Sequence, residues 1–181
     1  MSRYDDEIWR LVPEHAGPPD ARLAEFVRGL GRVERALDLG CGDGRLSAEL
    51  AAAELVAADV SEVALERARY RLPAARLVRV EPDEPLALPD HDFDLVLCAE
   101  TIEHVRDVQL LLSEARRVLR PGGRLAVTTP AVARVIATPD PLSPHIRFFN
   151  RASLGRLLAE LGFEPAELRR RSGTLFAVAT R

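Results

Sequence analysis

The sequence has no lysine, only two cysteines and no long apolar run. Because all 25 of its strongly basic side chains are arginine, the chain lacks the lysine that a P-loop nucleotide site places beside the phosphates. Cys41 and Cys98 are too few for a disulfide framework in a chain of 181 residues, which favours a reducing, cytoplasmic location. No stretch approaches the roughly 20 apolar residues of a membrane-spanning helix, so we expect no membrane span.

Charge and composition also narrow the function classes. A formal net charge of −3 gives no general electrostatic reason to bind nucleic acid. A hydrophobic fraction of 47% with 29% charged residues is typical of a globular protein. A length of 181 residues is ordinary for one domain. We therefore predict a single domain over residues 1–181 and no nucleic-acid partner.

Strand and helix patterns alternate from residue 35 onward. Helices predicted at 4–11 and 20–31 precede them, and we interpret residues 1–34 as an N-terminal helical lid. The predicted strands span 35–39, 55–59, 76–80, 93–98 and 124–129, and the predicted helices span 45–53, 61–71, 107–119 and 150–161. Four of the helices follow a residue typical of N-caps: Asp20, Ser61, Asp107 and Asn150. Two final strands, 163–168 and 174–180, are able to pair as a hairpin. This alternation predicts an α/β fold over 35–181, a doubly wound, Rossmann-like and mostly parallel sheet.

A glycine-rich turn, LDLGCGDGRLS, joins the first of these strands to the next predicted helix. Glycine is used where the backbone needs a positive φ or where another atom must come close. The turn amides and the helix N-terminus favour an anionic or carboxylate group of a ligand. Asp59 ends the second strand, where its carboxylate is placed to accept hydrogen bonds from a ribose diol. A dinucleotide fingerprint would have a glycine at position 45, which is arginine here, and this counts against NAD or FAD.

Four ordered segments resemble the class I S-adenosylmethionine-dependent methyltransferases: ALDLGCGDGRLS, AADVSEVALERA, FDLVLCAETIEHV and EARRVLRPGGRLAVTTP. The resemblance implies a seven-stranded sheet in which the C-terminal hairpin supplies one antiparallel strand. It implies S-adenosylmethionine as cofactor, with Asp59 on the ribose and Asp83 or its neighbours bordering the adenine. It also assigns the following residues to the cofactor site: Asp38, Gly40, Cys41, Gly42 and Gly44 at the methionine end, and Val60 and Ala99 after the second and fourth strands. We expect Asp59→Ala to weaken cofactor binding about tenfold or more while leaving the fold intact.

Candidate groups for activating a methyl acceptor follow the fourth strand. Glu100, Glu103 and His104 would share one face of a helical turn, and His145 could fold over the same site. Any of them could serve as a base for a hydroxyl acceptor, and together they would suit a divalent metal such as Mg²⁺. The E-x-x-E-H pattern resembles the O-methyltransferases of ubiquinone biosynthesis. With the later histidine it also resembles the small-RNA 3′-terminal 2′-O-methyltransferases, in which such residues hold a metal. A purely structural role, orienting the substrate loop, is an alternative.

These features predict an S-adenosylmethionine-dependent methyltransferase that acts on an oxygen of a small molecule. One alternative is a metal-dependent methyltransferase of the RNA 3′-terminal ribose. Another is a catalytically silent domain that binds S-adenosylmethionine, since the chain carries no added substrate domain.

Overall fold

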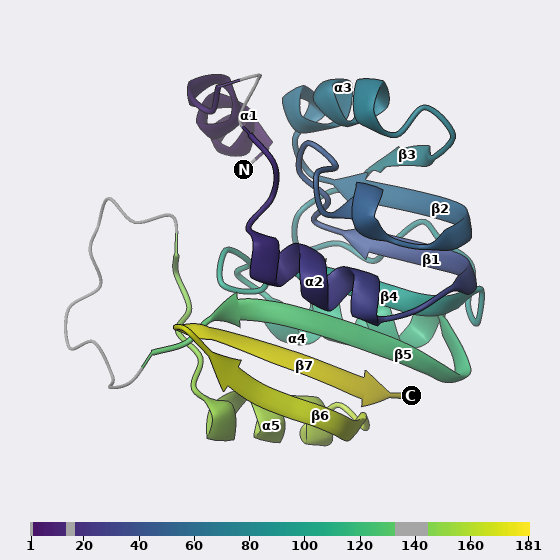
Figure 1. Cartoon of the computed structure of the whole chain (residues 1–181), viewed down its shortest axis with the longest axis vertical. Coiled ribbons are helices and arrows are strands. Elements are labelled where there is room, and N and C mark those ends of the chain that lie inside the picture. Colours follow the sequence, from purple (N-terminus) through teal and green to yellow (C-terminus); the bar gives the residue numbers. More distant parts are fainter. Residues whose placement is uncertain (1, 14–16, 133–144) are drawn as a thin grey trace.

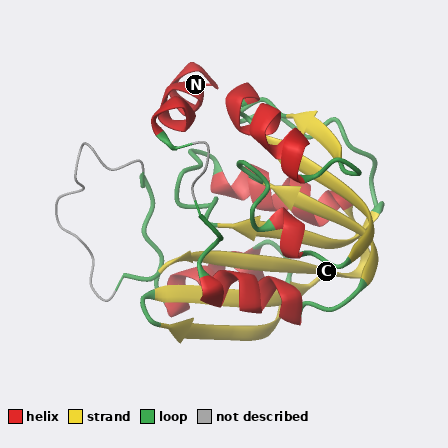
Figure 2. Ribbon diagram, turned by 45° about the horizontal axis from the view of Figure 1, so that its top comes forward, coloured by secondary structure: helices red, strands yellow, loops and turns green. Residues whose placement is uncertain are grey.

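A computed structural model of the protein describes residues 2–13, 17–132 and 145–181. Seven strands form one sheet in the order β3-β2-β1-β4-β5-β7-β6, and helices cover both of its faces (Figures 1 and 2). The strands are β1 (Val33–Leu39), β2 (Ala52–Asp59), β3 (Arg76–Arg79), β4 (Phe93–Ala99), β5 (Leu119–Pro130), β6 (Glu164–Arg171) and β7 (Thr174–Thr180). The helices are α1 (Ser2–Leu11), α2 (Ala21–Gly29), α3 (Glu62–Arg71), α4 (Val108–Val118) and α5 (Arg151–Glu160).

The sheet confirms the predicted fold class. Strands β1 to β5 pair in parallel, and β7 pairs antiparallel with both β5 and β6. Strand β1 lies between β2 and β4, so the strand order reverses there. In an open α/β sheet, this reversal leaves a crevice at the carboxyl ends of the strands. No helix among the described residues is long and apolar enough to cross a membrane.

The four predicted N-caps are confirmed. Asp20 accepts hydrogen bonds from the backbone N–H groups of Arg22 and Leu23, and Ser61 Oγ accepts from Ala64 N. Asp107 and Asn150 cap α4 and α5 in the same way. The helices therefore begin within one residue of where the sequence places them, because each cap satisfies amides that the first turn leaves unpaired.

Helix α2 packs on one face of the sheet as part of the core. Its Phe26 and Val27 are buried, and the Phe26 ring meets that of Phe176 edge-on with centroids 5.2 Å apart. The opposite face of the sheet is covered by α4 and α5, whose buried leucines and alanines join a second cluster. Helix α1 lies away from the sheet, beside α3 (Figure 1). The lid over residues 1–34 stays a prediction.

The predicted helix over 45–53 is wrong. Only a 3₁₀ turn, Ser47–Glu49, forms there, and β2 already begins at Ala52, opposite Val33. After the glycine turn the chain must return along the whole of β1, about 20 Å for seven residues of strand. A nine-residue helix advances only about 13 Å. The partly extended segment covers the distance that a helix would not.

Candidate active site

The glycine turn lies at the carboxyl end of β1, where the strand order reverses. Gly40 and Gly42 have φ values of +85° and +54°. A Cβ atom on Gly40 would lie 2.4 Å from Thr101 Cγ2, and one on Gly42 would lie 2.6 Å from Trp9 Cζ2. Both positions therefore need glycine for two reasons: the backbone has a positive φ, and there is no room for a Cβ atom. Gly44 also has a positive φ, +80°. Its Cβ would lie 2.7 Å from Cδ1 of Leu72, the C-cap residue of α3, so a glycine lets the turn pack against that helix.

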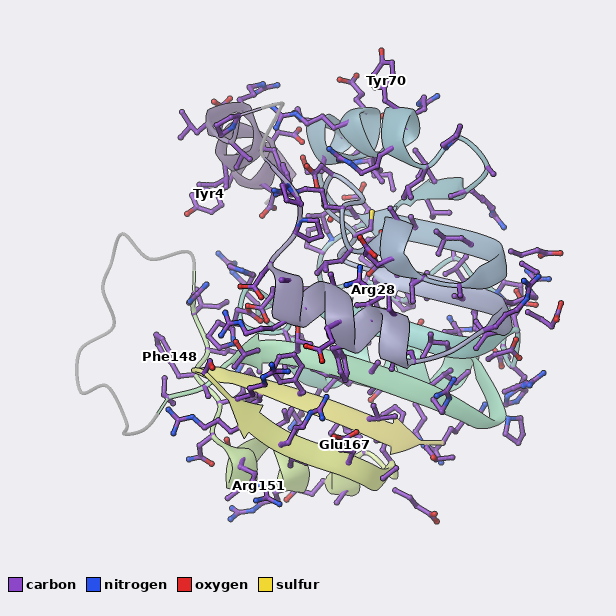
Figure 3. All side chains as sticks on the ribbon, viewed as in Figure 1. Tyr4, Arg28, Tyr70, Phe148, Arg151 and Glu167 are labelled. Carbon is purple, nitrogen blue, oxygen red and sulfur yellow. The ribbon has the colours of Figure 1, made fainter. Side chains whose placement is uncertain are left out.

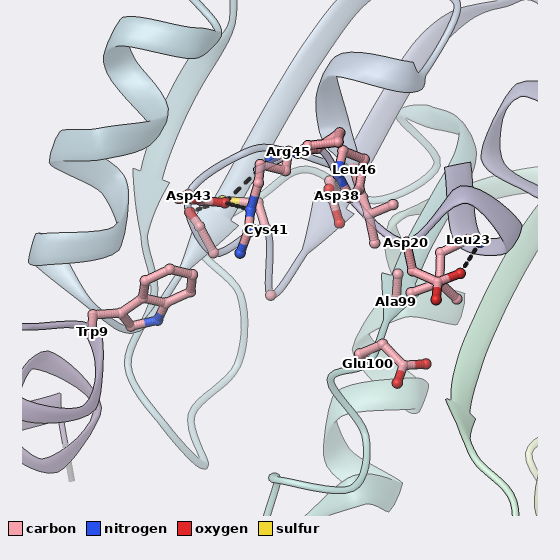
Figure 4. Close-up of a pocket in the computed structure, with 14 residues that line it drawn as sticks. Trp9, Asp20, Leu23, Asp38, Cys41, Asp43, Arg45, Leu46, Ala99 and Glu100 are labelled. Atoms are coloured by element: carbon pink, nitrogen blue, oxygen red, sulfur yellow. Dashed lines mark hydrogen bonds and ion pairs between the residues drawn. The ribbon is translucent and has the colours of Figure 1, made fainter. Parts of the chain in front are cut away.

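A pocket of about 270 Å³ opens beside this turn. Trp9 of α1 stands on one side of it and Glu100 on the other, near Asp20 (Figure 4). Of the predicted cofactor residues, five line the pocket: Asp38, Gly40, Cys41, Gly42 and Ala99. Gly44, Asp59, Val60 and Asp83 are not among its lining residues. The Asp83 side chain is exposed and accepts a hydrogen bond from Asp107 N, so nothing in its contacts supports a place at the adenine.

Asp59 ties the glycine turn to the start of α3. Its Oδ2 accepts a hydrogen bond from Gly42 N at 2.8 Å, and its Oδ1 accepts from Ser61 N at 2.9 Å. Burial raises the pKa of this carboxyl above its ordinary value. A carboxylate has about four acceptor positions, and the backbone amide of Val60 also acts on this one, so at least one position remains for a ribose hydroxyl. Because Asp59 also satisfies two buried amides, we expect Asp59→Ala to lower the stability of the fold as well as the affinity for the cofactor.

Asp38 is buried at the end of β1 with half of its carboxylate unpartnered. Burial raises its pKa to about 7, and Ser47 Oγ donates to its Oδ2. Its Oδ1 has no hydrogen-bond partner among the residues that the structure describes. Because buried polar atoms are nearly always hydrogen-bonded, this oxygen marks a place where a ligand donor belongs.

The lining of the pocket carries more carboxylates than cations. Four carboxylates line it, those of Asp20, Asp38, Asp43 and Glu100, together with Arg45. The 3₁₀ turn that replaces the predicted helix is too short to build a macrodipole. The charge of the lining therefore favours a ligand that carries a cationic group.

Three of the four predicted acceptor-side residues lie together. One ligand atom each of Glu103, His104 and His145 lies within 4.8 Å of the others. The two imidazole rings meet edge-on with centroids 4.8 Å apart. Backbone amides of Ile146 and Arg147 donate to the Glu103 carbonyl, which fixes the described end of the 130–149 segment beside the turn. Residues 133–144 of that segment lie outside the described residues.

Glu103 is the buried member of this group. Thr129 Oγ1 donates to its Oε2 at 3.0 Å. Its Oε1 lies 3.9 Å from His104 Nε2 and has no hydrogen-bond partner within the described part of the chain. Burial raises the pKa of Glu103 to about 7. This carboxyl can therefore exchange a proton near neutral pH, as a general base requires.

Glu100 does not share a helical face with Glu103 and His104. Its φ is +53°, and its amide donates to Thr128 O at 2.9 Å, so it sits in a sharp bend rather than in a helical turn. It lines the pocket beside Asp38 and Ala99 and is not in the group of Glu103, His104 and His145. The spacing rule for helices fails here because the backbone is not helical.

Asp20 and Arg45 have places in the pocket that the sequence does not predict. Asp20 caps α2, and its side chain also lines the pocket. Arg45 lines it too, and its Nε lies 3.0 Å from Oδ1 of Asp43, two residues away. The position of Asp20 beside the glycine turn depends on tertiary packing, which no local signal in the sequence marks. Tyr4, by contrast, points outward from α1 and is 55% exposed (Figure 3).

The residues present fit S-adenosylmethionine, the cofactor that the sequence resemblance implies. The backbone of the glycine turn lines the pocket at Gly40, Cys41 and Gly42. The unpartnered Asp38 oxygen and the spare acceptor capacity of Asp59 match an amino-acid tail and a ribose. The acidic lining suits a molecule that carries two positive charges, an ammonium and a sulfonium.

Comparison with known proteins leads to the same family. A family model described as "Methyltransferase domain" matches residues 37–127. A ubiquinone biosynthesis O-methyltransferase of Aromatoleum aromaticum is 33% identical, with 92% of this chain and 79% of that one covered. A protein of the same name from Mesorhizobium japonicum is 36% identical over 61% of this chain, which spans only 45% of that relative's length.

Solved structures agree on the fold. A SAM-dependent methyltransferase from Aquifex aeolicus superposes with a TM-score of 0.70 at 21% identity, covering 99% of this chain and 96% of that one. The match to the family model starts at Leu37 within β1, three residues before Gly40, and ends within β5, so it contains Asp38, Gly40 and Gly42 of the pocket. The chain therefore belongs to the class I S-adenosylmethionine-dependent methyltransferases.

Proposed function

We propose that this protein transfers the methyl group of S-adenosylmethionine, the cofactor of its family, to a hydroxyl oxygen of a small molecule. The observation that carries the proposal is the group of Glu103, His104 and His145 at the same sheet edge as the cofactor pocket. Oxygen acceptors need such a group because a hydroxyl must lose its proton as the methyl group arrives. Two relatives named for O-methylation in ubiquinone biosynthesis support the choice of oxygen.

The roles of the chain's own residues follow from their surroundings. The cofactor supplies a methyl group that its sulfonium has already activated. The glycine turn would hold the methionine end of the cofactor and Asp59 its ribose. The chain would position the acceptor hydroxyl in line with the methyl group, which alone contributes on the order of several kcal/mol to catalysis. Glu103 Oε1, buried and unpartnered, receives the hydroxyl proton. The edge-on His104 and His145 rings flank it and orient the acceptor.

The same three side chains would also hold a divalent cation. Two imidazoles and a carboxylate form a donor set that suits Zn²⁺, Mn²⁺ or Fe²⁺ better than Mg²⁺, which prefers oxygen ligands. Such an ion would lower the pKa of a bound acceptor hydroxyl. The close approach of the three ligand atoms favours this second role for the group.

An acceptor panel tests the proposal. Purified protein is incubated with methyl-labelled S-adenosylmethionine and phenols, catechols, amines or thiols, and the products are identified by mass spectrometry. We expect transfer to phenolic or catechol oxygen. Glu103→Gln should lower the rate by about a hundredfold or more while S-adenosylhomocysteine still binds. Glu167→Gln, on the exposed face of β6 (Figure 3), is the matched control and should keep the wild-type rate.

Three outcomes distinguish oxygen methylation by a general base, a metal-dependent reaction and a silent binding domain. Transfer only to nitrogen, sulfur or carbon, or a Glu103→Gln variant with the wild-type rate, would contradict the proposal. Loss of activity on chelation, restored by Mn²⁺ or Zn²⁺, would assign the cation role to the group. Tight binding of S-adenosylhomocysteine without transfer to any acceptor would instead support a silent binding domain.

A further inference from the structure

The chain just before α5 alternates the direction of its side chains. The His145 ring meets that of His104 edge-on, and Phe149 is buried in the core, whereas Ile146 is 52% exposed. Such alternation is typical of extended backbone. The odd-numbered side chains therefore face the protein, and Arg147 is the middle one of the three.

Arg147 joins this stretch to the turn after β4 through both its main chain and its side chain. Its backbone N–H and that of Ile146 donate to the Glu103 carbonyl, at 3.1 and 2.9 Å. Its Nε donates to Val105 O at 2.8 Å, and its Nη2 donates to Arg106 O. A guanidinium carries its donors in a rigid, planar fork. Bonds to two successive carbonyls therefore fix both the place and the direction of this side chain.

Arg147 and Phe149 together anchor the stretch that carries His145. Val132, two residues beyond β5, donates its backbone N–H to Phe149 O at 3.0 Å, while Arg147 ties the middle of the stretch to the turn after β4. His145 precedes Arg147 by only two residues, so these anchors determine where its imidazole ring lies. Without the guanidinium, the two main-chain bonds to Glu103 would have to hold the stretch to that turn.

We propose that Arg147 is a positioning residue: it holds His145 against His104 and Glu103, so that the group is arranged before the acceptor hydroxyl binds. This inference rests on the proposed function, because it assumes that the group handles the acceptor. Such an arrangement matters because a misplacement of about 1 Å at a reacting group can cost about a hundredfold in rate. Arg147 acts through His145, which distinguishes it from a residue that touches the acceptor.

Proton NMR of the histidine rings tests the positioning in the absence of any acceptor. The chain has four histidines, and the Hε1 signals of His104 and His145 are assigned by replacing each residue with glutamine. Because the two rings lie edge-on with centroids 4.8 Å apart, the ring current of each shifts the signal of the other. In Arg147→Gln both signals should move towards the values of a solvent-exposed histidine, since the rings separate.

Two further variants complete this test. Arg116→Gln is the matched control, because Arg116, in the last turn of α4, also donates its Nε to a main-chain carbonyl, that of Gly162 at 3.2 Å. It should leave the signals of both histidines in place. Arg147→Lys keeps the charge but not the planar fork, so it should move both signals in the same direction by a smaller amount. It also carries the test if Arg147→Gln does not fold.

A double-mutant cycle, with an acceptor identified in the panel, tests the consequence for catalysis. We expect Arg147→Gln to lower kcat/KM for the acceptor about tenfold or more, while the KM for S-adenosylmethionine stays within about twofold of wild type. In a His145→Gln background the same change should cost less than about twofold, because its effect passes through His145. A residue that only stabilises the fold would give additive losses instead.

The outcomes separate this inference from the proposed function. Histidine signals that are unchanged in both Arg147 variants, or an additive loss in the double variant, would overturn the role of Arg147 and leave the proposed function standing. Signals that move in a protein that methylates no acceptor would overturn the proposed function and, with it, the role of Arg147 towards the acceptor.

Discussion

Asp59→Ala should affect stability and cofactor binding at once, because one side chain serves both. In the structure the carboxylate accepts from Gly42 N and Ser61 N. Each buried amide left without an acceptor costs about 1–3 kcal/mol. Removing the buried charge of Asp59 returns part of that cost, as its raised pKa indicates. We therefore expect a net loss of about 2–4 kcal/mol in the free energy of unfolding.

This loss is large enough to measure by thermal unfolding. In a domain of this size, 1 kcal/mol corresponds to about 2–4 °C in Tm, so Asp59→Ala should melt about 4–16 °C below wild type by circular dichroism. Calorimetry below the melting transition should show S-adenosylhomocysteine bound at least about tenfold more weakly, since hydrogen bonds to a charged group contribute about 1.5–3 kcal/mol.

Asp107→Ala provides the control. It removes one exposed N-cap bond, to Leu110 N at 2.9 Å, so Tm should fall by only about 2–4 °C and cofactor affinity should not change. A Tm for Asp59→Ala equal to that of wild type would refute its role in tying the turn to α3. An unchanged affinity would remove Asp59 from the ribose site, whatever happens to stability.

Three further predictions concern the pocket walls. Gly42→Ala should push Trp9 away and weaken S-adenosylhomocysteine, because its Cβ would lie 2.6 Å from the Trp9 ring; binding calorimetry that gives the wild-type affinity would contradict this. Trp9 is the single tryptophan, so adding S-adenosylhomocysteine should change the intrinsic fluorescence of the protein, and an unchanged spectrum would count against α1 as a wall of the site. Asp38→Asn should raise Tm more at pH 8 than at pH 5. The pKa of Asp38 in the folded protein, about 7, lies above the ordinary 3.8, so the stability of the wild type falls as pH rises between these values. A gain in Tm that does not change with pH would contradict this.

Much of the fold could be predicted from local signals. Alternating apolar strands and capped helices specify a doubly wound sheet, and Asp20, Ser61, Asp107 and Asn150 cap helices as predicted. The missing helix after the glycine turn could not be predicted in this way. Its absence follows from the pairing of Val33 with Ala52, which fixes how far the connecting segment must reach, and periodicity does not report strand pairing.

The candidate site, too, could be predicted only in part. The glycine turn, Asp38 and Asp59 stand at strand ends, so topology alone brings them to one edge of the sheet. Helical spacing predicts that Glu100 lies on the same face as Glu103. This prediction fails because the backbone at Glu100 has a positive φ and is not helical. The approach of Trp9 to Gly42 joins residues far apart in the chain. Such contacts depend on how α1 packs beside α3, which the sequence pattern does not encode.

The central claim is that the pocket beside Gly40 and Gly42 binds S-adenosylmethionine, and a crystal structure with S-adenosylhomocysteine tests it most directly. The account predicts one nucleoside per chain, with its ribose hydroxyls within hydrogen-bonding distance of Asp59 and its amino-acid tail beside Asp38 and the glycine turn. A pocket that stays empty at saturating ligand, or a ribose bound away from Asp59, would contradict it.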